Sequence, residues 1–155
     1  MTNSANPVVV AVDEQDELVV DLGRWSALAQ AAFQHRGVTA GELNLLFVDT
    51  DSIHELNREH MGKDWPTDVL SFPLDDDDDL PGETLLGDVV VCPAVAAANA
   101  PEHNGQGHHR GSVEDEIALL VVHGVLHVLG YDHTNDDEAE EMEALEQTVL
   151  LAHYR

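Results

Sequence analysis

Basic residues are scarce in this chain, which has six Lys and Arg against 31 Asp and Glu and a formal net charge of −25. Phosphate contacts need cations, so this balance taken alone argues against nucleic-acid binding and requires any basic site to be local. Cysteine is almost absent as well. The single Cys92 excludes an internal disulfide and is typical of a buried thiol in a reducing cytoplasm.

Long apolar runs are also missing. No stretch approaches the roughly 18 apolar residues of a membrane span, so we expect no membrane partner. The segment Met1–Asn6 has no basic residue ahead of its apolar stretch, which argues against a secretory signal and favours a cytoplasmic location. With 155 residues and a hydrophobic fraction of 43%, the chain is expected to form a single domain over residues 1–155.

The most informative feature is the spacing of histidines in the run HGVLHVLGYDH, which begins at His123 and ends at His133. A helix advances about 100° per residue, so His123 and His127 share one face and can bind one metal ion. Gly130 is suited to end this helix in a left-handed turn, which lets His133 return as a third ligand. The interpretation is one Zn²⁺ held by three histidines and a water, as in catalytic zinc sites, where the pKa of that water falls to about 7.

The spacing is similar to the H-E-x-x-H-x-x-G-x-x-H motif of metzincin proteases, with one difference. Gly124 stands where the proteases carry their general-base glutamate, so a zinc peptidase is kept only as an alternative. The preceding run Ile117–Val122 predicts that this helix is mostly buried. Unpaired imidazoles there would be costly without a shared ligand, which favours metal binding.

Hydrophobic periodicity and capping residues predict nine elements. The expected strands are Val8–Val12, Glu42–Asp49, Thr67–Pro73 and Leu86–Cys92, and the expected helices are Leu22–Arg36, Thr50 or Ser52 to Met61, Ala94–Ala100, Ser112 to the turn at Gly130, and Asp136–Tyr154. The last two strands should form an antiparallel hairpin, with Asp75–Asp79 in a solvated acidic tip.

Two further polar regions receive structural interpretations. His103–Gly111 contains three histidines, but its glycines favour a flexible polar loop over a second metal site. The final helix is expected to turn Met142, Leu145 and Val149 inward, and its many glutamates are interpreted as a solvated surface.

A second group of residues lies in the segment Leu56–Pro73. Here Lys63 could contact a phosphate and Trp65 could stack on a base. The alternative is an ordinary helix-to-strand loop with an exposed aromatic residue.

At these residues the chain resembles the YbeY family of bacterial rRNA maturation factors. The matching segments are Leu56-Asn57, Gly62 to Pro73, Leu86 to Cys92, and His123 to His133. The resemblance implies an α+β fold with a roughly four-stranded mixed sheet, about five helices, and the metal site on a helix and its following turn. It also implies a zinc-dependent, single-strand-specific endoribonuclease that acts in 3′-end maturation of small-subunit rRNA and in ribosome quality control, with ribosomal RNA and the ribosome or small-subunit proteins as partners.

The resemblance assigns His123, His127 and His133 to the metal, and we take His123 as the catalytic residue. One departure from the family stands out: many members carry an arginine two residues before the Lys-Asp pair, where this chain has Met61. Arg58, nearly one helical turn earlier, and Lys63 are the cations that could replace it, and with Trp65 they are the predicted RNA contacts. A non-enzymatic ribosome-assembly factor with a structural metal is the main alternative.

Overall fold

The structure, a computed structural model, describes residues 7–73 and 85–154. Its elements follow in the order β1 (Val8–Asp13), α1 (Leu22–His35), β2 (Glu42–Phe47), α2 (Thr50–Met61), β3 (Val69–Pro73), β4 (Leu85–Val91), α3 (Pro93–Asn99), the 3₁₀ helix η1 (Ala100–His103), α4 (Val113–Val128) and α5 (Asp136–His153). The predicted acidic tip at Asp75–Asp79 lies outside the described residues. None of the helices in the described ranges has the length and apolar character needed to cross a membrane.

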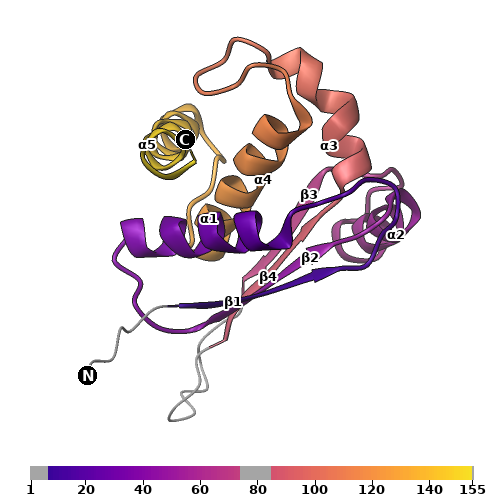
Figure 1. The fold of residues 1–155 in the computed structure, drawn as a ribbon, viewed down its shortest axis with the longest axis horizontal. Coiled ribbons are helices and arrows are strands. Elements are labelled where there is room, and N and C mark those ends of the chain that lie inside the picture. The colour runs from indigo at the N-terminus through magenta and orange to yellow at the C-terminus, as the bar shows by residue number, and fades with distance from the viewer. Residues whose placement is uncertain (1–6, 74–84, 155) are drawn as a thin grey trace.

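The strands form one mixed sheet in the order β1-β2-β4-β3. β1 pairs with β2 and β2 with β4 in parallel, whereas β3 runs antiparallel to β4. The expected α+β class is therefore confirmed, as is the antiparallel pairing of the last two strands. Figure 1 shows this sheet edge-on, with α1 and α4 lying against one face.

Short polar side chains begin the helices at nearly the expected positions. Asp21 and Ser112 cap α1 and α4, each by accepting a backbone N–H from three residues further on. α2 begins at Thr50, one of its two expected starts, and Asp49 caps it, because the Asp49 carboxylate accepts the N–H of Ser52 at 2.8 Å. That hydrogen bond lowers the pKa of the Asp49 carboxyl.

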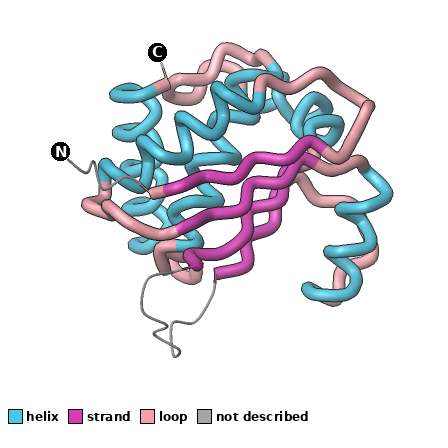
Figure 2. Tube along the Cα trace, turned by 60° about the horizontal axis from the view of Figure 1, so that its bottom comes forward, coloured by secondary structure: helices cyan, strands magenta, loops and turns pink. Residues whose placement is uncertain are grey.

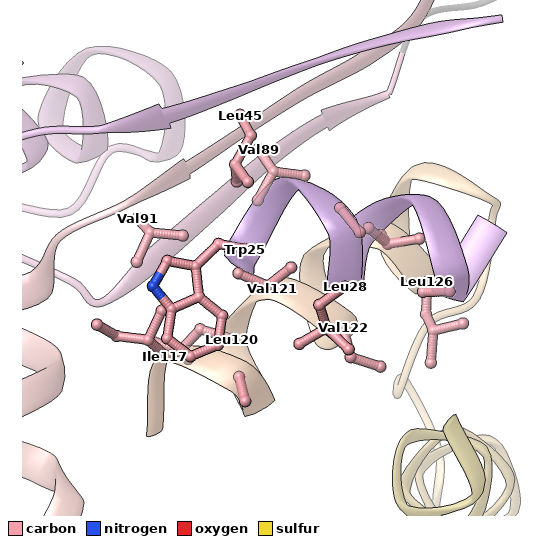
Figure 3. Packing of buried hydrophobic residues seen from close by; sticks show 14 of the residues in the cluster. Trp25, Leu28, Leu45, Val89, Val91, Ile117, Leu120, Val121, Val122 and Leu126 are labelled. Atoms are coloured by element: carbon pink, nitrogen blue, oxygen red, sulfur yellow. The ribbon is translucent and has the colours of Figure 1, made fainter. Parts of the chain in front are cut away.

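The main core lies between the sheet and the pair α1 and α4. In Figure 3, Trp25 of α1 lies between Ile117 and Leu120 of α4 on one side and Val91 of the sheet on the other. Trp25 is only 2% exposed, so its large apolar surface contributes strongly to holding the two layers together. α5 packs in turn on α1 and α4, so that α4 is enclosed from several sides.

A smaller core lies on the opposite face, beneath α2. Ile53 of α2 packs there with residues from the sheet and the loops beside it, namely Val48, Leu70, Val90 and Cys92. Burial raises the pKa of the Cys92 thiol, which is free, so the prediction of a buried thiol is confirmed. Figure 2 shows α2 at one end of the sheet, away from the helices that cover the other face.

Gly124 sets how closely α4 approaches the sheet. A Cβ atom at this position would lie 2.6 Å from Cγ1 of Val89 and 3.3 Å from the hydroxyl oxygen of Ser71. The Ser71 hydroxyl already donates to the Gly124 carbonyl at 3.3 Å. A glutamate here would therefore be directed into the sheet, so the residue that distinguishes this chain from the proteases is a packing requirement.

Replacing Gly124 by alanine is expected to destabilise the protein by about 1–3 kcal/mol, because the added methyl group overpacks the contact between α4 and β4. Chemical denaturation measures the effect. Gly23→Ala is the matched control: it is also a helical glycine, but its added Cβ would make an ordinary 3.6 Å contact, so a gain of up to about 1 kcal/mol is expected. Equal effects from the two substitutions would contradict this account of Gly124.

Candidate metal centre

The C-terminal end of α4 positions the two helical histidines. His123 and His127 lie one turn apart near this end, and Gly130 follows with a φ of 101°. The N–H groups of Gly130 and Tyr131 donate to the carbonyls of His127 and Leu126, both at 3.0 Å. These are the two hydrogen bonds of a Schellman motif, so the prediction that Gly130 ends the helix in a left-handed turn is confirmed.

The turn brings the third histidine back to the first two. One ring nitrogen from each of His123, His127 and His133 lies within 4.8 Å of the others. The ring centroids are 4.5 Å apart for His123 and His127, and 5.6 and 5.1 Å from each of these to His133. The three imidazoles that the sequence spacing placed on one face therefore do converge. His123 and His127 are half-buried and His133 is exposed.

Two hydrogen bonds determine which nitrogens of the helical pair face the centre. Nδ1 of His127 lies 2.9 Å from the carbonyl oxygen of Tyr131, and Nδ1 of His123 contacts a carboxylate oxygen of Glu146. A carbonyl and a carboxylate only accept, so both Nδ1 atoms carry the proton and donate it. In the neutral rings, each Nε2 is then left with a lone pair.

The two Nε2 atoms face one another. Nε2 of His123 and Nε2 of His127 are 3.0 Å apart. Burial, followed by the neighbouring His123 and His133, lowers the pKa of His127 below its usual 6.5, which favours its neutral form. Two imidazole nitrogens this close together can bind one shared cation. The residues therefore fit a metal ion: the Nε2 atoms of His123 and His127 are placed to bind it, and hydrogen bonds from their Nδ1 atoms hold the rings in position.

Glu146 corrects the interpretation of the final helix as a wholly solvated acidic surface. This side chain is buried at the interface of α5 with α4 and accepts from His123. The sequence does contain a sign that Glu146 faces inward. It lies on α5 one helical turn after Met142, which faces inward, and beside Leu145, another residue of the predicted inward face. Predicting the contact itself would have required the rotation of α5 about its own axis.

A second histidine group forms where a flexible loop was expected. His108 and His109 are buried, and the loop is anchored to α4 by Glu116, which accepts from His103 Nδ1 at 2.7 Å and from His109 Nε2 at 2.8 Å. The expectation of flexibility is therefore wrong for these side chains. Histidine–carboxylate pairs replace solvent around the buried polar atoms.

The position of the proton on the histidine rings separates this group from the three-histidine site. The ligand atoms of His103, His109 and Glu116 are also mutually close. However, Nδ1 of His109 accepts the N–H of Gly111 at 2.9 Å, so its proton sits on Nε2 and points at the carboxylate. With that proton in place the nitrogen has no lone pair to give a metal, and the group is a hydrogen-bond network.

A cavity of about 700 Å³ opens beside the three histidines. His123, His127 and His133 form one wall, and the lining also includes Met61 at the end of α2 and, from the loop after it, Lys63 and Trp65. The ammonium of Lys63 lies 6.0 Å from the centroid of the Trp65 ring, and Trp65 is 56% exposed. Lys63 and Trp65, two of the predicted RNA contacts, therefore line the same cavity as the three histidines.

Arg58 is placed differently from the other two predicted contacts. It is absent from the lining of this cavity, and its guanidinium lies 3.8 Å from the exposed carboxylate of Glu55. Such an exposed pair contributes little to stability. Met61, at the position of the family arginine, does line the cavity and is 44% exposed.

Fold and site together define a class: an α+β protein whose three-histidine site, on one helix and its following turn, could hold a metal ion at the wall of an open cavity. The family model described as Endoribonuclease YbeY matches residues 11–154. The chain therefore belongs to the YbeY family.

Relatives of this chain agree over most of its length. A protein of Salinispora tropica named Endoribonuclease YbeY is 48% identical and is matched over 88% of this chain and 89% of its own length. One of the same name from Chromohalobacter salexigens is 44% identical, over 94% and 90%. A solution structure of a Thermotoga maritima protein superimposes with a TM-score of 0.58 at 26% identity, covering 94% of this chain and 91% of that one.

Removing the carboxylate that holds His123 is expected to weaken metal binding. Glu146→Ala should lower zinc affinity by about 10- to 100-fold, because the imidazole loses the acceptor that orients it. A competition titration against a chromophoric zinc chelator measures this. Glu140→Ala removes an exposed acid from the same helix and should leave the affinity unchanged. Equal affinities for the two variants would contradict the assigned role of Glu146.

Proposed function

We propose that this protein is a zinc-dependent endoribonuclease that cleaves single-stranded RNA, acting in the cytoplasm on the 3′ end of small-subunit rRNA and in ribosome quality control. We further propose that residues 1–155 act as one domain and that the ribosome or small-subunit proteins are its partners. The endoribonuclease name of its relatives supports the reaction class. Imidazole ligands are well suited to zinc, which supports the choice of metal.

The observation that carries this proposal is the convergence of His123, His127 and His133, with two Nε2 atoms 3.0 Å apart at the wall of an open cavity. His123, His127 and His133 would hold the metal, and His123 is the residue that we assign to catalysis. Zinc in such a centre supplies Lewis acidity toward a phosphoryl oxygen and acidifies water. A structural zinc site would have four protein ligands, whereas here three histidines converge.

The chain's own residues can position the strand. Trp65 offers an exposed aromatic face on which a base can stack, a contact that tolerates any base. Lys63, held against that ring, places a positive charge where a phosphate would approach. Met61 supplies no charge at the position of the family arginine, so Lys63 would carry the phosphate contact in this cavity.

The acidity of the chain limits how RNA can be bound. A net charge of −25 repels a polyanion at long range, so attraction must come from the short-range contacts in the cavity. Stacking and one local cation meet this requirement, because neither depends on the overall field. A peptidase is disfavoured by Gly124, because the side chain of a glutamate at this position would start toward Val89 and Ser71 of the sheet.

Purified protein is expected to cleave single-stranded RNA, to lose this activity in a chelator, and to regain it when zinc is restored. His133→Ala should lose both zinc, measured by elemental analysis, and cleavage, measured on denaturing gels. Casein and a peptide pool serve as substrates for the peptidase alternative. If the folded, zinc-loaded protein cleaves no RNA, the proposed enzymatic activity is wrong, and the alternative of an assembly factor with a structural metal is favoured.

The two cations near the cavity offer a matched comparison. Lys63→Ala should weaken binding of a single-stranded RNA oligonucleotide and reduce the slope of log K against log salt by about 0.7, the value for one phosphate contact on a single strand. Arg58→Ala removes the same charge outside the cavity lining and should leave the slope unchanged. Fluorescence anisotropy at several salt concentrations tests both. An equal loss of RNA affinity from each substitution would mean that binding depends on the overall charge of the protein and not on Lys63 in the cavity.

A further inference from the structure

We propose that a second, smaller cavity, which meets the same three-histidine site, binds one RNA base next to the cleaved bond, with His103 as the residue that recognises it. This inference rests on the proposed endoribonuclease function and adds a specificity-determining site to it. The cavity is bounded by α4, α5 and the loop after η1.

Position and size indicate what this cavity could hold. His123 and His133 line both cavities, so a strand crossing the histidine site from the larger one would enter the smaller one. The smaller cavity measures about 280 Å³. That is just below the roughly 300–1,000 Å³ of sites for drug-sized ligands, which favours a single planar base over several nucleotides.

The lining favours a base over a phosphate. None of the residues that line this cavity is Lys or Arg, and two of them, Glu143 and Glu146, are acids. A phosphate would be repelled by these carboxylates. Leu119, Ala139 and Met142 contribute apolar surface on which an uncharged ring can rest.

His103 provides a hydrogen-bonding group of defined orientation. Its Nδ1 donates to Glu116 at 2.7 Å, and its side chain is 35% exposed. Its other ring nitrogen, Nε2, has no hydrogen-bond partner among the described residues, whereas His109 uses both nitrogens. A fixed ring with one available nitrogen can distinguish the edges of different bases, and the exposed Gln106 beside it can supply an amide.

The position of Glu116 supports a role beyond stability. Its side chain is fully buried, and Oε2 has no hydrogen-bond partner in the described part of the protein. A buried carboxylate oxygen that is left unpaired costs free energy. The carboxylate nevertheless holds His103 through its other oxygen, which is what positioning of the ring requires.

The test uses the zinc-loaded full chain and four single-stranded RNAs that differ only at the nucleotide beside the cleaved bond. The wild type should prefer one base. His103→Ala and Gln106→Ala should reduce that preference, with KM for the preferred RNA rising about three- to tenfold, the worth of one hydrogen bond, and kcat changing less. Binding of the same sequences as cleavage-resistant 2′-O-methyl strands, followed by anisotropy, should show the same loss.

His35→Ala is the matched control, since it removes an exposed histidine that lines neither cavity. Unchanged preference, KM and binding in both variants would overturn the base-binding site, even though the enzyme cleaves. Wild-type protein that binds the resistant strands with the expected base preference, but cleaves no RNA, would retain the site and overturn the proposed nuclease activity. Elemental analysis confirms that each variant keeps its zinc.

Discussion

The site depends on two hydrogen bonds that orient its imidazoles, one to the turn inside the histidine motif and one to a helix outside it. The carbonyl of Tyr131 and the carboxylate of Glu146 each take an Nδ1 proton, and this leaves the two Nε2 atoms facing one another. Each acceptor comes from a different part of the chain: the turn that ends α4, and the later helix α5. A metal held by these histidines would therefore depend on the docking of α5 on α4, which buried side chains such as Met142 and Val149 maintain.

α4 is the element through which the layers of the molecule meet. It contacts the sheet, α1, α3 and α5, and Gly124 lets it approach β4 closely. A histidine pair carried by such an enclosed helix is held in place by its surroundings, whereas His133, on the following turn, is exposed. All three histidines nevertheless line the same cavity, so the enclosed helix and the exposed turn both contribute to its wall.

Charge limits where the proposed RNA contacts can lie. The overall charge of the chain repels a polyanion, so the proposed contact would depend on the local pairing of Lys63 with Trp65. The smaller cavity continues this division of roles, because its lining has apolar surface and fixed hydrogen-bonding groups but no Lys or Arg. One cavity suits the backbone and a stacked base, and the other suits the edge of a base.

The sequence by itself determined the elements, the left-handed turn at Gly130 and the convergence of the three histidines, because helical periodicity and capping act over a few neighbouring residues. Only the tertiary structure decided that Glu146 is buried against His123, that Glu116 anchors the loop histidines, and that Lys63 reaches the cavity while Arg58 does not. These contacts join residues far apart in the chain. They depend on how α5 is rotated and where loops cross, which a local pattern does not specify.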